Sequence, residues 1–228
     1  MTAFDDLVAE RLHELQQRIA RAGGMGVTVL PVTKSFPVAA CWAAYRAGCV
    51  AVGENYAQEV VAKFGGQLGQ APPLPVHFIG QLQTNKVRML APIVALFGSV
   101  DRASQVKELA KRAVGARILI QVAPGGFGSE TAAKGGCPIE EVPALVEAAT
   151  AAGLRVEGLM AVGPTVGGAE AARPLFRSVR TLASKLGLAT CSIGMSGDLE
   201  VAVQEGSTEV RIGTALFGER PQLDTLVR

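Results

Sequence analysis

Lys34 is the residue of this sequence that is best placed to do covalent chemistry. It follows the β-branched run 27–33 and precedes Ser35-Phe36-Pro37, so we expect it at the end of a buried strand. Burying a charged amine is costly, and a site that lowers the lysine pKa provides a neutral amine that can form a Schiff base with an aldehyde. The alternative is a lysine whose stem covers apolar surface while its ammonium stays in water.

Two glycine-containing segments near the other end of the chain are typical of phosphate-binding loops. They are residues 192–198, Ser-Ile-Gly-Met-Ser-Gly-Asp, and residues 211–218, Arg-Ile-Gly-Thr-Ala-Leu-Phe-Gly. Glycine lets the backbone approach a phosphate, while hydroxyls and helix-start amides donate to it. Ser196 and Thr214 are the candidate phosphate ligands, although both also suit the role of an ordinary helix N-cap.

A phosphate site together with a reactive lysine suits pyridoxal 5′-phosphate, which carries both a phosphate and an aldehyde. The ring nitrogen of this cofactor needs an acid or an arginine as its partner, and Arg211 is the candidate. An arginine stays charged, so it would hold the ring nitrogen unprotonated and weaken the cofactor as an electron sink. The alternative for Arg211 is an ion pair with Glu209 or Glu54.

Eight short apolar runs alternate with helical patterns, after a first amphipathic helix that ends at Gly23-Gly24. The predicted strands cover 27–33, 49–53, 75–80, 94–99, 116–122, 155–161, 189–193 and 209–212. The predicted helices between them cover 37–47, 55–68, 83–91, 102–113, 138–152, 168–187 and 197–205. The alternation predicts parallel pairing, and we expect an α/β fold: a single (β/α)8 TIM-type barrel over residues 1–228 with an extra N-terminal helix. A doubly wound open sheet is the rival, but no G-x-G-x-x-G follows the first strand.

In such a barrel, functional groups gather at the carboxyl ends of the strands. Polar residues stand at nearly every predicted strand end, which favours a ligand-binding face. They include Lys34, Glu54, Asn55, Gln81, Ser99, Asp101, Gln121, Ser192, Ser196 and Arg211. The glycine-rich segment 123–136 after the fifth strand is typical of a lid or a binding loop.

The composition excludes several classes of protein. A chain that is 49% hydrophobic and 18% charged can bury a large core, and a net charge of +2 without a basic run argues against binding to nucleic acid or to an anionic membrane. No segment approaches the length of a membrane span. The four cysteines are scattered, as in a reduced cytoplasmic protein, and the two histidines have no metal-ligand spacing, so we expect no metal site.

Several segments, in one order along most of the chain, resemble those of the pyridoxal phosphate homeostasis proteins, a family similar to the barrel domain of alanine racemases. They are Thr33-Lys34-Ser35, residues 53–59 (GENYAQE), 77–86 (HFIGQLQTNK), 99–102 (SVDR), 158–160 (GLM), 194–198 (GMSGD) and 206–214 (GSTEVRIGT). The resemblance implies a (β/α)8 barrel with Lys34 as the Schiff-base lysine and Arg211 near the ring nitrogen. It also implies that Ser196, Gly213, Thr214 and, as a weaker candidate, Ser192 lie at the phosphate, with Asn55 and Met160 close to the cofactor.

The chain departs from the family pattern at a few positions. Val76 precedes His77 where tryptophan is usual, Gly98 stands where histidine is common, and residues 121–123 read Gln-Val-Ala instead of Gln-Val-Asn. These changes affect details of the lid and of the substrate face rather than cofactor binding.

The expected function is therefore intracellular homeostasis and supply of vitamin B6, in the form of pyridoxal phosphate, without robust catalytic activity. A slow amino-acid racemase or decarboxylase is the alternative, and it needs a second base opposite Lys34, for which Tyr56 and His77 are the candidates. A third possibility is a sugar-phosphate-binding barrel without the cofactor. Enzymes that lack their pyridoxal phosphate are the expected recipients. The low aromatic content, 5%, favours a monomer.

Overall fold

The computed structural model of the chain describes residues 2–66, 71–124 and 135–220. Its eight strands are β1 (Thr28–Pro31), β2 (Val52–Glu54), β3 (Val76–Phe78), β4 (Val94–Val100), β5 (Arg117–Val122), β6 (Arg155–Ala161), β7 (Thr190–Ser192) and β8 (Glu209–Ile212). All neighbouring pairs are parallel, in the order β1-β8-β7-β6-β5-β4-β3-β2. The amide of Thr33 donates to Gly53 O at 3.0 Å and brings the two ends of the sheet together. The predicted (β/α)8 barrel is thus confirmed.

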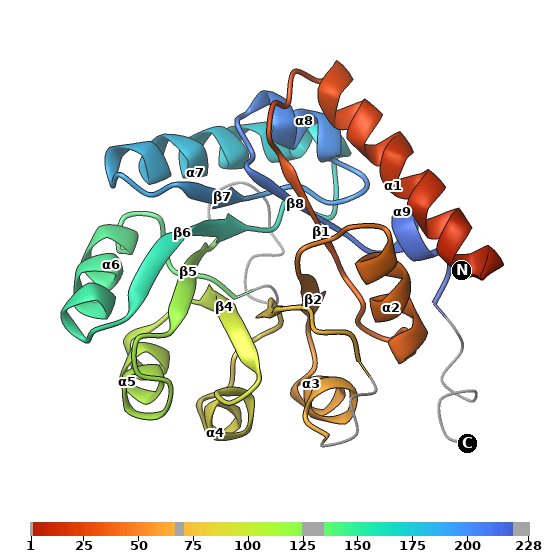
Figure 1. Ribbon diagram of the computed structural model, residues 1–228. Helices are drawn as coiled ribbons and strands as arrows, with labels where there is room; N and C mark the ends of the chain where they lie inside the picture. The colour runs from red at the N-terminus through yellow and green to blue at the C-terminus, as the bar shows by residue number, and fades with distance from the viewer. Residues whose placement is uncertain (1, 67–70, 125–134, 221–228) are drawn as a thin grey trace.

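The helices surround the ring of strands (Figure 1). They are α1 (Ala3–Arg21), α2 (Val38–Arg46), α3 (Ala57–Phe64), α4 (Val87–Leu90), α5 (Ala103–Arg112), α6 (Val142–Ala151), α7 (Arg173–Lys185), α8 (Leu199–Gln204) and α9 (Thr214–Phe217). Two 3₁₀ turns, η1 (Thr84–Lys86) and η3 (Ala169–Ala172), lead into α4 and α7. No helix within these described ranges is both long and apolar enough to cross a membrane.

The predicted N-terminal helix is α1, which lies across α2, α8 and α9 (Figure 1). The side chain of Thr2 accepts from the amide of Asp5, and the carboxylate of Asp5 accepts from the amide of Thr2. This reciprocal capping box satisfies two amides at the start of the helix. Asp5 is buried and also pairs with Arg46 of α2 at 3.0 Å, so the cap ties α1 to its neighbour.

Buried apolar side chains form two separate clusters. The larger one fills the space between the strands and the helices. The smaller one consists of Leu96, Leu119 and Met160, with Ile79 packed against it. These four residues come from or directly follow β3 to β6, so this apolar filling occupies one side of the barrel interior.

Most predicted strands and helices are found within a few residues of their expected bounds. The second strand is the clearest shift, because it covers Val52–Glu54 rather than 49–53, and Val50 is 68% exposed in the preceding turn. The predicted helix 168–187 is divided into η3 and α7, since Pro174 occupies the first turn of α7 and cannot continue an earlier helix. Most of the predicted loop 123–136, namely 125–134, lies outside the described residues.

The first and last strands of the barrel are partners. Leu30 of β1 is in register with Arg211 of β8, and the amide of Val32 donates to Ile212 O at 2.8 Å. This pairing sets the strand that precedes Lys34 directly beside the strand that carries Arg211.

Candidate functional site

Lys34 lies in the turn that follows β1, between two residues held by the carboxylates of Glu54 and Glu59. Ser35 has a φ of +60°, in the left-handed region that a residue with a Cβ rarely adopts. Its amide donates to Glu59 Oε2 at 2.8 Å, and the hydroxyl of Thr33 donates to Glu54 Oε1 at 2.7 Å. The backbone on both sides of Lys34 is therefore fixed by carboxylates.

Lys63 of α3 links these carboxylates. Its ammonium donates to Glu54 Oε1, Glu59 Oε2 and Thr33 O, each at 2.8 Å. Glu54 is fully buried, and burial raises its pKa even though Lys63 and Thr33 favour the charged form. Burial alone would lower the pKa of Lys63, but Glu54 and Glu59 raise it, so Lys63 stays a cation. The cluster of Glu54, Glu59 and Lys63 is thus an ionic group beneath the turn, with Glu54 buried and the other two partly exposed.

Lys34 itself forms no ion pair within the described ranges. The nearby carboxylates of Glu54 and Glu59 pair with Lys63 instead. Burial lowers the pKa of the Lys34 ammonium, and the positive charges of Arg220 and Arg211 act in the same direction, against Glu54 and Glu59. A half-buried lysine with a lowered pKa and no ion-pair partner is a better candidate nucleophile than an exposed, paired one.

Arg211 is buried on β8 and forms neither of the two ion pairs considered for it from the sequence. Its guanidinium donates to Ser192 O at 2.5 Å, to Ser192 Oγ at 2.9 Å and to Ala161 O at 2.8 Å. Burial lowers its pKa from the ordinary arginine value, while Glu209 is the carboxylate that most strongly opposes this. Arg211 is therefore locked in one orientation by β6 and β7.

The two glycine-containing loops lie after β7 and β8. Gly194 has a φ of +97°, and a Cβ there would lie 2.4 Å from the Cβ of Ala202, so only glycine fits this turn. Asp198 accepts from the amide of Met195 at 2.6 Å and closes the first loop. Ser196 is half-buried and Thr214 exposed, and neither hydroxyl is a side-chain hydrogen-bond cap within the described residues. Their N-cap role, the alternative considered above, is thus not realised.

Asn55 and Gly80 meet where β2 and β3 end. A Cβ at Gly80 would lie only 1.9 Å from Asn55 O, so a side chain there would push the two strand ends apart. The side-chain oxygen of Asn55 is buried, with no hydrogen-bond partner in the described part of the chain. A buried unpartnered acceptor is costly and points to a donor that is supplied by a ligand or by water. Met160, which is 1% exposed, belongs to the apolar cluster inside the barrel.

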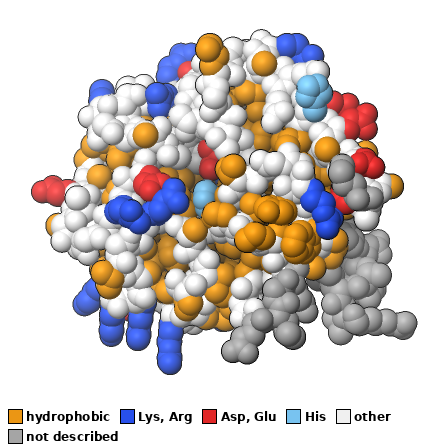
Figure 2. Space-filling view, viewed as in Figure 1, with side chains coloured by type: hydrophobic (Ala, Val, Ile, Leu, Met, Phe, Trp, Pro, Cys, Tyr) orange, Lys and Arg blue, Asp and Glu red, His pale blue; other side chains and the backbone are white. Residues whose placement is uncertain are grey.

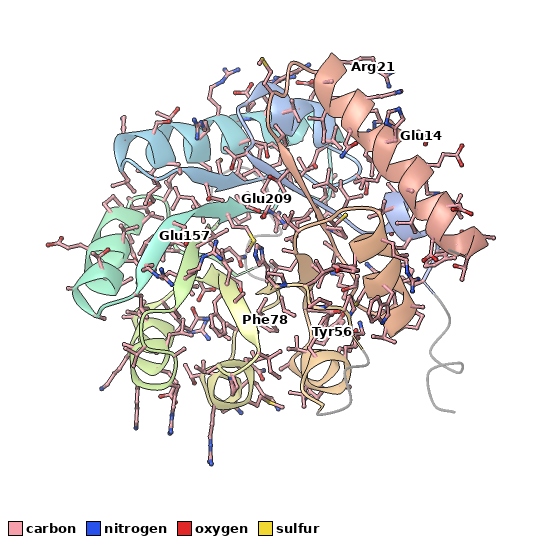
Figure 3. All side chains as sticks on the ribbon, viewed as in Figure 1. Glu14, Arg21, Tyr56, Phe78, Glu157 and Glu209 are labelled. Carbon is pink, nitrogen blue, oxygen red and sulfur yellow. The ribbon has the colours of Figure 1, made fainter. Side chains whose placement is uncertain are left out.

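Three further residues singled out from the sequence are Ser192, His77 and Tyr56. Ser192 is fully buried, and its hydroxyl donates to Glu209 Oε1 at 2.7 Å. His77 Nδ1 lies 3.7 Å from Glu209 Oε2. Tyr56 is 50% exposed at the start of α3 (Figure 3). Within the described ranges, no group of three or more His, Cys, Asp or Glu residues is suited to a metal ion.

Lys63 and Glu209 are the important residues that sequence reasoning missed. The only signal for Lys63 was its spacing of four residues from Glu59, which is typical of a solvent-exposed helical ion pair. Glu209 had been considered only as a direct partner of Arg211. In both cases the decisive contact joins different elements of the barrel.

Comparison with known proteins gives consistent matches over nearly the whole chain. Residues 6–221 match the family described as "Alanine racemase, N-terminal domain". The pyridoxal phosphate homeostasis protein of Pseudomonas aeruginosa is 40% identical over 216 residues, covering 93% of each chain, and that of Aquifex aeolicus is 39% identical, covering 92% of this chain and 97% of the relative. PipY of Synechococcus elongatus, solved with PLP bound, has a TM-score of 0.77 at 31% identity and covers 92% of this chain and 100% of its own.

The buried ionic cluster predicts a large effect for Lys63→Met. The change leaves Glu54 buried without its cation, which we expect to lower the free energy of unfolding by about 3–5 kcal/mol. Urea denaturation followed by circular dichroism measures it. Arg112→Met is the control, because Arg112 pairs with Glu108 on the surface and its loss is expected to cost under about 1 kcal/mol. Equal midpoints for the two variants would contradict the role given to Lys63.

The environment of Lys34 predicts its pH profile. Only the neutral amine reacts with an acylating reagent, and burial disfavours the cation, so the rate of Lys34 modification should reach half its maximum below pH 10.5, the ordinary lysine value. Competitive labelling with a small acylating reagent, read by peptide mass spectrometry, measures this profile. Exposed Lys107 in the same sample serves as the internal reference. A Lys34 midpoint at or above 10.5 would show that the site does not activate the amine.

Proposed function

We propose that this chain, which belongs to the alanine racemase N-terminal domain family and, within it, to the pyridoxal phosphate homeostasis proteins, binds pyridoxal 5′-phosphate and takes part in vitamin B6 homeostasis. The observation that carries the proposal is the pairing of β1 with β8. It brings a lysine with a lowered pKa and no ion-pair partner among the described residues next to a buried, oriented arginine.

The donor set suits each part of this cofactor. Lys34 supplies the amine for a Schiff base with the aldehyde, and Arg211 faces the ring nitrogen. The phosphate lies between the two glycine-containing loops, where Ser196, Thr214 and the amide of Gly213 donate to it. Asn55, whose buried oxygen lacks a partner, accepts from the cofactor or from a water beside it. The cofactor supplies an aldehyde and an electron-withdrawing ring, and the protein supplies orientation and charge.

Two residues of the site act indirectly in this proposal. The hydroxyl of Ser192 is already engaged by Arg211 and Glu209, so we assign Ser192 to the support of Arg211 instead of to the phosphate. Met160 lies in the apolar filling of the barrel and forms part of the floor on which the ring rests. We propose that both lie close to the cofactor.

The protein holds and supplies the cofactor without robust catalytic turnover in this proposal. Racemisation needs a base on each face of the reacting carbon. Of the two candidates for the second base, Tyr56 is half exposed on α3, and His77 faces Glu209 at the start of β8, away from the strand end that carries Lys34. An arginine at the ring nitrogen further disfavours carbanion chemistry. Enzymes that lack their pyridoxal phosphate are the proposed recipients, and a cytoplasmic monomer is the proposed working form.

The covalent link is tested by reduction of the purified protein with borohydride after addition of pyridoxal phosphate. We expect a yellow protein whose reduced adduct maps to Lys34 by peptide mass spectrometry. Lys34→Ala should abolish the adduct, whereas Lys86→Ala, which removes another half-buried lysine near the end of β3, should leave it intact. A colourless wild-type protein without an adduct would overturn the proposed function and leave a phosphate-binding barrel.

The phosphate assignment is tested by comparing pyridoxal phosphate with pyridoxal, which lacks the phosphate. The double variant Ser196→Ala/Thr214→Val removes two hydroxyl donors, so its dissociation constant for pyridoxal phosphate should rise on the order of a hundredfold. Its affinity for pyridoxal should stay close to that of the wild type. If both ligands weaken equally, or neither weakens, the phosphate lies elsewhere. Absorbance titration measures all four dissociation constants.

A further inference from the structure

A chain of polar side chains runs through the barrel interior from Arg211 to His77. Arg211 donates to Ser192 Oγ at 2.9 Å, and Ser192 Oγ donates to Glu209 Oε1 at 2.7 Å. The other oxygen of Glu209 lies 3.7 Å from His77 Nδ1. Arg211 and Ser192 are buried, while the side chains of Glu209 and His77 are 13% and 12% exposed.

The contact between Glu209 and His77 crosses the inside of the barrel. Glu209 begins β8 and His77 lies on β3, and β1 and β2 separate these strands in the sheet. Two side chains from strands so far apart meet only by pointing inward. Arg211, two residues after Glu209, points to the same side and lies nearer the carboxyl end of β8. Figure 3 shows Glu209 near the middle of the ring of strands.

The hydroxyl of Ser192 gives this chain a direction. A hydroxyl has one proton, and Ser192 gives it to the carboxylate of Glu209. A lone pair of the same oxygen therefore faces Arg211, whose guanidinium can only donate. The negative charge of Glu209 thus holds Ser192 in the one orientation that accepts from Arg211.

Glu209 also balances the charge of Arg211. A buried guanidinium is destabilised unless opposite charge or oriented dipoles surround it. The carbonyls of Ala161 and Ser192 supply dipoles, and Glu209 is the carboxylate that most favours the charged form of Arg211. Without Glu209, the guanidinium would keep its carbonyl partners but lose its nearest negative charge.

We propose that Glu209 is a positioning residue of the cofactor site, which acts through Ser192 to orient Arg211 and to set the positive charge that the ring nitrogen meets. The inference rests on the proposed function, because it assigns Arg211 to the ring nitrogen. It predicts that a residue at the amino-terminal end of β8, without contact to the cofactor, changes the electronic spectrum of the bound cofactor.

The test is Glu209→Gln, which keeps the size of the side chain and removes its charge. A glutamine oxygen still accepts from Ser192 but carries no negative charge, so the hydrogen bond that orients Ser192 weakens and the dissociation constant for pyridoxal phosphate should rise roughly tenfold. The absorption maximum of the bound cofactor should shift by several nanometres, since the field at the ring nitrogen becomes more positive. The adduct at Lys34 should still form at saturating cofactor.

Glu157→Gln is the matched control. Glu157 lies on β6 (Figure 3) and pairs with Arg117 at 2.5 Å. It has no hydrogen bond to Ser192 among the described residues. The change of residue type is the same, so an unspecific effect of neutralising a barrel carboxylate would affect both variants. We expect the wild-type spectrum and affinity for Glu157→Gln.

Ser192→Ala provides a second variant, which keeps both charges and removes the link between them. It should shift the spectrum, and Glu209→Gln added to it should shift the spectrum by less than Glu209→Gln alone. The inference is overturned if the wild type binds the cofactor while Glu209→Gln and Ser192→Ala both match Glu157→Gln in spectrum and affinity. A wild type that binds no cofactor overturns the proposed function instead. If Glu209→Gln does not fold, Ser192→Ala decides the question.

Discussion

The interaction on which the site depends is the contact of one ammonium, that of Lys63, with the carboxylates of Glu54 and Glu59. Without it, these two carboxylates would be free to pair with Lys34 and would stabilise its charged, unreactive form. Lys63 also donates to Thr33 O, so the same group neutralises the carboxylates and fixes the turn. Lys63 thus keeps these carboxylates from pairing with Lys34.

The interior of the barrel is divided between apolar and polar filling. Leu96, Leu119 and Met160 occupy the side formed by β4 to β6. The polar side comes mainly from β7 and β8 and consists of Arg211, Ser192, Glu209 and His77. On the outer surface, Figure 2 shows a group of basic and acidic side chains near a broad hydrophobic area. In the proposed function, this division of the interior would give the cofactor ring an apolar floor on one side and a charged partner on the other.

Much of this organisation could be predicted from local sequence, and the reasons for the rest are physical. The eight strands follow from β-branched runs. Lys34 and Arg211 stand out because a charged side chain at the end of a buried strand is costly to bury. The role of Lys63 could not be predicted, because the helical spacing that marks it also describes a surface pair, and only packing of α3 onto the turn buries it.

Ser192 shows the same limit on a smaller scale. The family resemblance implied a position at the phosphate for Ser192, as a weaker candidate. Which group a hydroxyl contacts depends on the neighbouring strands, and β8 places Glu209 and Arg211 on either side of it. The start of the second strand was also misjudged. Residues 49–51 are as apolar as the strand itself, but Val50 is 68% exposed and pairing with β3 begins only at Val52.

The pairing of β1 with β8 has a consequence for synthesis of the protein. Lys34 follows the first strand to leave the ribosome, whereas Arg211 and the second glycine-containing loop belong to the last. A contact so distant in sequence forms only after the intervening chain has been made. A growing chain therefore carries Lys34 long before the barrel that buries the amine and lowers its pKa is complete. We expect a Schiff base with an aldehyde ligand to form only on completed molecules.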